Sequence, residues 1–435
     1  MAVETNIISF DEKEVRTFSD QRGEPAWFLE ARLAALSNLN ALPMPSPDKT
    51  SIKRWNFTDF TYELPASNLS SLDQLPEQLK TVVNPEKPAE NLLILKDQHA
   101  VYQSLSKDLA DKGVVFTDLN TALKEHSDLV KSYYLNEAVK ADEHRLTALH
   151  AAFVNGGAFL YVPKNVVIEE PLQAVYWNEA EGAGFFNHVL IVAEENAAVT
   201  YVESNMSTGN EHAVGNIVAE VIAKNNAQVK FGAVDLLASS MTSYINRRGI
   251  AHRDARIDWA LGQMNEGDTI SDNLTLLMGD NSYGDTKSVS VGRGEQKQNF
   301  STNITHYGKA SEGYILQHGV MKDSASSIFN GIGKIEHGAV KANAEQTSRV
   351  LMLNDRARGD ANPILLIEED DVTAGHAASV GRVDPSQLFY LMSRGISRTE
   401  AERLVIRGFL APVLKELPIE AVQKQLAAVI ERKLS

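Results

Sequence analysis

The 435-residue sequence contains no cysteine. Without thiols the chain forms no disulfides, offers no thiolate nucleophile, and supplies neither zinc-knuckle ligands nor the usual ligands of an iron–sulfur cluster. Any metal ion that this chain binds must therefore be held by histidine or carboxylate side chains.

Long apolar runs and basic clusters are also missing. No run approaches the roughly 18 apolar residues that a membrane-spanning helix requires. The formal net charge of −15 repels phosphate backbones and anionic lipids. Residues 1–14 are acidic and have neither the apolar core of a signal peptide nor an Arg-rich presequence. We therefore expect a cytoplasmic protein with no membrane or nucleic-acid partner.

The common catalytic signatures are absent too. Residues 292–300, "GRGEQKQNF", lack the G-K-[ST] ending with which a phosphate-binding loop holds ATP and Mg²⁺. The chain contains neither H-E-x-x-H nor G-x-S-x-G, the signatures of common zinc and serine hydrolases. We therefore assign no catalytic residue and expect no tightly bound cofactor.

Residues 1–150 predict a mixed α/β cap. The stretch "EPAWFLEARLAALSNL" has leucines at helical spacing and Pro25 at the expected helix start, and prolines then prevent regular structure to about Ile52. Two short strands are predicted over residues 91–96 and 113–119, followed by a helical stretch over residues 127–154.

Residues 151–375 predict a parallel β-helix. Short runs of Val, Ile, Tyr and Thr alternate with Asn, Asp and Gly, and a small residue recurs about every 27 to 30 positions. These small residues are Ala197, Ala227, Ala255, Ser282, Ala310 and Ala339. A β-sandwich or a propeller is the alternative, but a small residue at each corner suits coils that stack on one another. The two ends of such a body need covers, which we expect the terminal helical segments to provide.

Residues 376–435 predict two or three short helices. Asp384 is placed to cap a helix that begins at Pro385 and ends near Gly395. Ser397 opens a second helix, and Pro418 a third.

His376 is the most conspicuous histidine, because its neighbours in "AGHAAS" are all small and four acidic residues, 368–371, precede it. A neutral imidazole near carboxylates can bind iron or zinc. A purely structural role at a strand-to-helix junction is the alternative. For His188, His306 and His318, isolated among strands and turns, we expect structural roles.

A carbohydrate-cleaving β-helix would need paired carboxylates on one face of the coils. Asp254 and Asp280 are the available candidates, but aspartate is also favoured in turns for backbone reasons. This enzyme class remains an alternative function.

The C-terminal string "DDVTAGHAASVGRVDPSQLFYLMSRGIS" resembles the signature of the SufB/SufD family of iron–sulfur cluster assembly scaffolds, D-V-x-C-S-H-G-A-T-x-G-x-x-D followed by L-F-Y-L-x-S-R-G-I. Further segments that resemble the family are "EPAWFLEARLAALSNLNALPMP", "RWNFTDF" and "ALHAAFVNGGAFLYVPKNVVIEEPLQ". Ala374 stands where members often carry cysteine, and Gly375 replaces serine, whereas His376 aligns with the family histidine. The chain thus resembles the SufD-like branch, which lacks the thiols of the SufB paralogue.

The resemblance implies a right-handed parallel β-helix between an N-terminal α/β and a C-terminal helical subdomain. It also implies pairing with a SufB-type subunit, docking of a SufC-type ABC ATPase on the terminal helices, and a transient iron–sulfur cluster or iron at the SufB interface. His376 would be the metal ligand, and Leu388, Phe389, Tyr390 and Arg394 would contact or orient the ATPase. Packing of Leu388, Phe389 and Leu391 against the β-helix end is the alternative to docking, and a stand-alone homodimer is the alternative to the complex.

Overall fold

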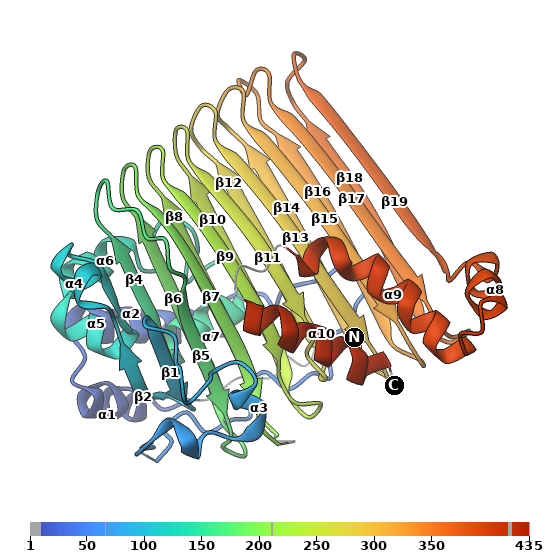
Figure 1. Ribbon diagram of the computed structural model, residues 1–435. Coiled ribbons are helices and arrows are strands. Elements are labelled where there is room, and N and C mark those ends of the chain that lie inside the picture. The colour runs from blue at the N-terminus through green and yellow to red at the C-terminus, as the bar shows by residue number, and fades with distance from the viewer. Residues whose placement is uncertain (1–9, 66, 210–211, 416–419, 435) are drawn as a thin grey trace, which may run out of the picture.

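The computed structural model describes residues 10–65, 67–209, 212–415 and 420–434, and its centre is a long solenoid of parallel strands (Figure 1). The strands form two sheets, with the orders β19-β17-β15-β13-β11-β9-β7-β5-β1-β2 and β18-β16-β14-β12-β10-β8-β6-β4-β3. From β4 onward successive strands alternate between the sheets, and all pairs except β1–β2 and β3–β4 are parallel. The predicted parallel β-helix is therefore confirmed.

The ten-stranded sheet consists of β1 (Leu92–Lys96), β2 (His99–Ser104), β5 (Leu172–Asn178), β7 (Ala198–Ser207), β9 (Gln228–Leu236), β11 (Arg256–Gln263), β13 (Tyr283–Gly292), β15 (Glu312–Met321), β17 (Asn343–Met352) and β19 (Thr373–Arg382). The nine-stranded sheet consists of β3 (Val115–Asp118), β4 (Gly156–Val162), β6 (Gly184–Ala193), β8 (Val214–Ala223), β10 (Thr242–Ala251), β12 (Thr269–Leu277), β14 (Lys297–His306), β16 (Ser326–Ile335) and β18 (Arg358–Ile367).

One corner of the coils is built on left-handed residues that stack from coil to coil. Asn196, Asn226, Asp254 and Asn281 have φ angles of 57 to 61°, a conformation that Asn and Asp tolerate best among residues with a Cβ. The Asn226 amide donates to Asn196 Oδ1 at 2.9 Å, and the Asn281 amide donates to Asp254 Oδ1 at 3.0 Å. These side-chain bonds and the backbone bonds beside them hold neighbouring coils in register.

The small residue that follows each left-handed residue is buried, as the repeat predicted for Ala197, Ala227, Ala255 and Ser282. The assignment of Ala310 was wrong by one position. Ala310 has a φ angle of 52° and occupies the left-handed place, and Ser311 is the buried small residue.

The N-terminal cap closes the first coil. Its helices are α1 (Glu12–Arg22), α2 (Ala26–Asn38), the 3₁₀ helix η1 (Leu72–Gln74), α3 (Glu77–Lys80), α4 (Lys107–Asp111), α5 (Leu119–Glu125), α6 (Ser127–Tyr133) and α7 (Arg145–Phe153). Leu109 of α4 packs into the cluster that fills the space between the sheets. The helical stretch predicted over residues 127–154 is two helices, because Leu135 adopts a left-handed φ of 47° between them.

The outer face of the nine-stranded sheet buries ionisable groups under the cap. His150 of α7 lies against His188, with Nε2 and Nδ1 3.0 Å apart, and both rings are fully buried. Glu220 is equally buried and accepts bonds from the backbone N–H groups of Leu135 (2.7 Å) and Val139 (3.0 Å). Burial raises the pKa of Glu220 to about 8 and lowers the pKa of His188 to about 3.

The C-terminal helices are α8 (Pro385–Ser393), α9 (Arg398–Leu414) and α10 (Glu420–Leu434). Asp384 caps α8 as predicted, accepting a bond from the Ser386 N–H at 2.8 Å. Pro418, the predicted start of the third helix, lies outside the described residues. No helix in the described part of the chain is long and apolar enough to cross a bilayer.

None of the described helices covers the C-terminal end of the solenoid, where a cover was expected. Helices α9 and α10 pack on the outer face of the ten-stranded sheet, and α8 projects beside the last coil (Figure 1). Leu426 fills a notch at Gly262, where an added Cβ would lie 2.9 Å from its side chain. The predicted domain boundary at 375/376 falls inside β19, because the last strand continues to Arg382.

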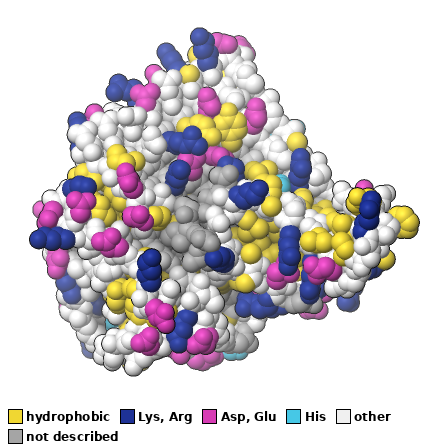
Figure 2. All heavy atoms as spheres, in the orientation of Figure 1, with side chains coloured by type: hydrophobic (Ala, Val, Ile, Leu, Met, Phe, Trp, Pro, Cys, Tyr) yellow, Lys and Arg dark blue, Asp and Glu magenta, His cyan; other side chains and the backbone are white. Residues whose placement is uncertain are grey.

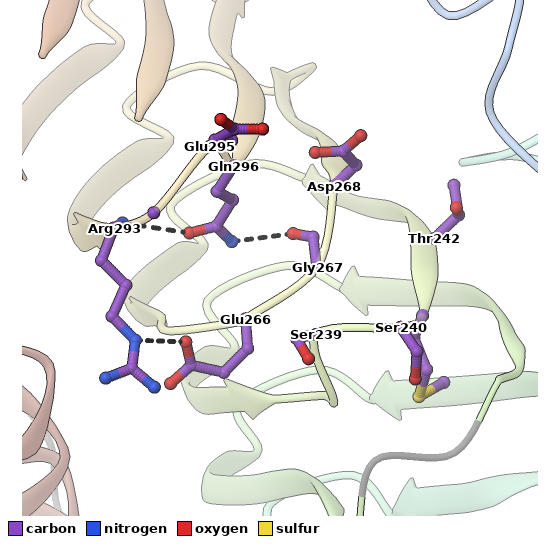
Figure 3. A pocket seen from close by; sticks show the side chains of 11 residues that line it. Ser239, Ser240, Thr242, Glu266, Gly267, Asp268, Arg293, Glu295 and Gln296 are labelled. Carbon is purple, nitrogen blue, oxygen red and sulfur yellow. Dashed lines mark hydrogen bonds and ion pairs between the residues drawn. The ribbon is translucent and has the colours of Figure 1, made fainter. Parts of the chain in front are cut away.

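The C-terminal turn of α10 is anchored to the solenoid through Lys433. Its fully buried ammonium donates to the carbonyls of Met264 (3.1 Å) and Asn265 (2.8 Å) and lies 3.5 Å from Glu266 Oε2. Glu266 also accepts a bond from Arg293 at 2.8 Å, at the rim of the pocket in Figure 3. Burial lowers the pKa of Lys433 to about 8, against the opposing effect of Glu266.

Substituting Glu220 by glutamine should remove one pH dependence of stability. The folded-state pKa of about 8 lies above the usual 4.5, so the unfolded chain loses this proton first and stability falls as pH rises between these values. The free energy of unfolding of the wild type, relative to Glu220→Gln, should therefore drop by about 2 to 4 kcal/mol from pH 5 to pH 8. Urea titrations measure this, and a constant difference would contradict the burial argument.

Lys433→Met should loosen α10 without unfolding the solenoid. Two backbone carbonyls lose their charged donor, at a cost of about 1 to 3 kcal/mol. Hydrogen exchange should accelerate in α10 and not in β5 to β15. Lys112→Met is the control, because Lys112 is half-exposed and forms an ion pair only within α4 and its C-terminal cap. Unchanged exchange in α10 would show that the anchor is not needed.

Candidate functional site

The last coil of the solenoid is the open end of the fold. Strands β18 and β19 occupy the terminal positions of the two sheets, so each has one edge with no strand partner among the described residues. Apolar side chains are exposed along them: Ile364 (37%), Leu366 (47%), Ile367 (44%) and Val380 (42%). An unpaired edge flanked by apolar side chains is typical of a protein interface.

His376 lies on this last coil, in a column of residues that begins deep in the interior. The backbone register aligns Tyr201, Phe231, Trp259, Thr286, Ile315, Gln346 and His376 on successive strands of the ten-stranded sheet. Tyr201 and Phe231 stack with ring centroids 5.2 Å apart, and Phe231 and Trp259 with centroids 4.8 Å apart. Since these rings fill the space between the sheets, the same register places the side chain of His376 on the inner side of β19.

In the column that contains His376 the interior side chains change from aromatic to polar toward this end, whereas Phe300, Phe329 and Val350 form an apolar cluster elsewhere in the last coils. Gln317 is fully buried, donates to Thr302 Oγ1 at 3.0 Å and accepts from Ser348 Oγ at 2.9 Å. Gln346 donates to the carbonyl of Ile364 at 2.8 Å. The open end therefore has polar side chains in its interior and exposed apolar side chains along β18 and β19.

The surroundings of His376 match what its sequence neighbours suggested. Ala374 and Ala378 flank it on the same side of β19, and the exposed imidazole forms no hydrogen bond or ion pair with the described residues. Glu369, from the preceding acidic run, instead accepts bonds from the N–H groups of Gly338 (2.9 Å) and Asp370 (3.0 Å), which lower its pKa. The described residues contain no group of three His, Asp or Glu side chains that could hold a metal ion.

Helix α8 carries a second exposed surface. Phe389 is 74% and Tyr390 59% exposed, whereas Leu388 is buried. Arg394 at the C-terminal cap lies over the Tyr390 ring, 5.3 Å from its centroid. A groove of about 430 Å³, lined by Ser386, Gln387, Tyr390, Leu391 and Val405, separates α8 from α9. Figure 2 shows apolar side chains on this projecting lobe. Phe389 therefore does not pack against the β-helix end, which was the alternative to partner docking.

The other histidines singled out in the sequence have structural roles, as expected. His188 is buried under α7. His306 is buried, with Nδ1 2.9 Å from Ser311 Oγ. His318 is nearly buried and stacks on Phe409, its Nδ1 2.7 Å from the Phe409 carbonyl oxygen.

The carboxylates considered for carbohydrate cleavage belong to turns. Asp254 has a left-handed φ of 59° and accepts from the Asn281 side chain, and Asp280 accepts from the N–H of Lys309 at 2.8 Å. Their bonds account for aspartate at both positions without a catalytic role.

Sequence reasoning missed two parts of this end: the exposed apolar residues of β18 and the buried partner of His376 in the register, Gln346. Counting one coil back from His376 along the repeat would have found Gln346. No local sequence signal marks Ile364 or Leu366 as exposed. Both look like ordinary buried strand residues, and they are exposed only because β18 is the last strand of its sheet among the described residues.

Comparison with known proteins agrees with this architecture. A family model described as "SufBD protein N-terminal region" matches residues 22–174, and one described as "SUF system FeS cluster assembly, SufBD core domain" matches residues 176–409. The iron–sulfur cluster assembly protein SufD of Bacillus subtilis is 63% identical over 430 residues, 98% of either chain. An iron–sulfur cluster assembly SufBD family protein of Staphylococcus saprophyticus is 31% identical over 422 residues, 94% of this chain and 90% of its own. The resemblance seen in the C-terminal motif is thus confirmed, and the chain belongs to the SufBD family.

Proposed function

We propose that this chain is a non-catalytic scaffold subunit for iron–sulfur cluster assembly in the cytoplasm. It pairs with a SufB-type subunit through the open end of the solenoid and docks a SufC-type ABC ATPase through α8 and the groove beside it. The iron or nascent cluster is its cargo. The name of the B. subtilis relative, an iron–sulfur cluster assembly protein, supports the process.

The observation that carries the proposal is the position of His376. Its imidazole lies at the open end on an unpaired strand, and the described residues offer no three-ligand set for a metal ion. A single neutral imidazole is a competent but incomplete site for iron. Because the chain has no cysteine, sulfur ligands have to come from the paired subunit.

The chain connection supports a coupling between the two surfaces. Strand β19 ends at Arg382 and α8 begins at Pro385, so two residues join the strand that carries His376 to the helix that carries Phe389. A force applied to α8 by a docked ATPase would act directly on the edge of the last coil. This link gives ATP hydrolysis in the partner a route to the subunit interface.

His376→Ala should leave the assembly of the three-protein complex intact and reduce the iron or cluster that co-purifies with it. The imidazole is exposed and makes no contact on which the fold depends. His337→Ala is the matched control, because His337 is 88% exposed at a nearby turn. Equal iron content in wild type and His376→Ala would contradict the assignment of His376 as a ligand. A measured mass of two copies of this chain, with no SufB-type subunit bound, would instead favour a homodimer.

Phe389→Asp combined with Tyr390→Asp should abolish binding of the ATPase while the unfolding midpoint stays unchanged. Phe389 is 74% and Tyr390 59% exposed, and the contact of Tyr390 with Arg394 lies at the surface, so their replacement removes contact area mainly from a partner. Tyr307→Asp is the control, since Tyr307 is a 43% exposed aromatic residue at a solenoid turn. Calorimetric titration with the ATPase measures the effect, and an affinity within a factor of two of wild type would place the docking surface elsewhere.

A further inference from the structure

Four buried polar side chains join the N-terminal cap to the nine-stranded sheet in one chain of hydrogen bonds. His150 of α7 lies between Asn216 of β8 and His188 of β6, with its Nδ1 3.1 Å from Asn216 Oδ1 and its Nε2 3.0 Å from His188 Nδ1. His188 Nε2 lies 3.1 Å from Glu220 Oε1. Because all four side chains are buried, their hydrogen positions are set by one another and not by solvent.

One end of the chain fixes its direction. Asn216 Nδ2 donates to the carbonyl oxygen of Leu146 in α7 at 3.0 Å, so Asn216 Oδ1 faces His150 and accepts from its Nδ1–H. A neutral imidazole has a single N–H, so His150 Nε2 accepts from His188 Nδ1–H, and His188 Nε2 is left as an acceptor. The last contact therefore needs a donor on Glu220.

The contact between Glu220 and His188 therefore has to hold a proton. An ionised carboxylate only accepts hydrogen bonds, and no other described atom forms a hydrogen bond with His188 Nε2. An imidazolium facing a carboxylate would use the same number of protons, but it places two charges in a buried site. Burial raises the pKa of Glu220 to about 8 and lowers the pKa of both His150 and His188. The proton thus resides on the carboxyl group.

Other charged groups around the chain do not supply this donor. The titratable and charged side chains that face it are those of Arg32, Tyr134, Glu137 and Arg248. Arg32 is paired with Glu24 (2.6 Å), and Arg248 with Glu143 (2.7 Å) and Asp272 (3.8 Å). Arg248 lowers the pKa of Glu220, as do the N–H groups of Leu135 and Val139, and Glu137 raises it, but burial has the largest effect.

The same carboxyl group holds the segment that connects α6 to α7, residues 134–144. Its two oxygens accept the N–H groups of Leu135 and Val139. The Tyr134 ring packs on His188, with the ring centroids 4.5 Å apart. Glu220 therefore closes the hydrogen-bond chain and also fastens this segment of the cap to β8.

We infer that the hydrogen-bond chain from Glu220 to the Leu146 carbonyl is a proton-dependent latch between cap and solenoid, and that loss of the Glu220 proton loosens residues 134–144 and α7. The chain has four contacts. His188, His150 and Asn216 supply one donor each, so without the carboxyl proton two acceptors face each other at one contact, whichever tautomers form. The inference is independent of the proposed function.

Infrared spectroscopy of the full-length chain tests the proton. The difference between wild type and Glu220→Gln should contain the C=O band of a carboxylic acid at pH 6.5, where ordinary Asp and Glu side chains are ionised. The band should disappear as the pH rises through about 8. A difference spectrum at pH 6.5 with only carboxylate bands would overturn the inference.

Hydrogen exchange of the same chain tests the latch. Glutamine keeps an N–H donor at position 220 that does not titrate, so dividing the protection of residues 134–144 in wild type by that in Glu220→Gln cancels the intrinsic effect of pH. The carboxyl regains its usual pKa of 4.5 when the latch opens, against about 8 when it is closed. The ratio should therefore fall about tenfold per pH unit between pH 5.5 and 7.5.

Glu194→Gln is the matched control, because Glu194 accepts a hydrogen bond from Tyr133 of the same cap at 3.3 Å but is not part of the chain. It should keep the pH dependence of the wild type. If Glu220→Gln does not fold in urea titrations, exchange of residues 134–144 relative to α10 within the wild type replaces the ratio. A protection ratio that is constant with pH, or an equal fall in α10, would show that no local latch exists.

Discussion

The backbone hydrogen bonds between coils are the constraint on which the rest of the structure depends. Each strand from β6 to β17 pairs with the strand one coil before it and the strand one coil after it, and the left-handed corner residues repeat this pairing at the turns. In such a repeat, the backbone N–H and C=O groups of every interior coil form hydrogen bonds with the two neighbouring coils. The last coil has a neighbour on one side only, so some of its backbone groups are left without these bonds. The N-terminal end is closed by α4 and the antiparallel strands, whereas β18 and β19 each have one edge without a strand partner in the described part of the chain. His376, the candidate ligand, lies on β19, so the uncovered end of the solenoid and the candidate site coincide.

The side chains that fill the solenoid interior differ between its middle and its open end. Around β5 to β11 the space between the sheets is filled in part by Tyr176, Tyr201, Phe231 and Trp259, large side chains that each bury a large apolar area. Near the open end, Gln317, Ser348 and Gln346 share the interior with a smaller apolar cluster around Phe300 and Phe329. Polar side chains bury less favourable area but hold fixed positions through directed hydrogen bonds. The interior of the last coils is therefore partly polar and partly apolar.

The C-terminal helices divide into a fixed and a projecting part. Leu426 in the notch at Gly262 and the buried ammonium of Lys433 hold α10 on the outer sheet face. Helix α8, in contrast, keeps Phe389 in solvent and is joined to β19 by two residues. A partner bound to α8 would therefore act on β19, while α10, which is fixed on the sheet face, would hold the remainder of the solenoid in place.

The sequence by itself determined the β-helix, its repeat of small residues and the capped helix after Asp384, because corner, cap and turn preferences act within a few residues along the chain. It also singled out His376 as a candidate ligand. The family motif added the process in which the chain acts. Only the tertiary structure decided that the C-terminal helices lie along a sheet face and leave the last coil uncovered, that Phe389 is exposed, and that Gln346 lies behind His376. These features depend on which coil a residue pairs with and on what is absent beyond the last strand, and neither is written in local sequence.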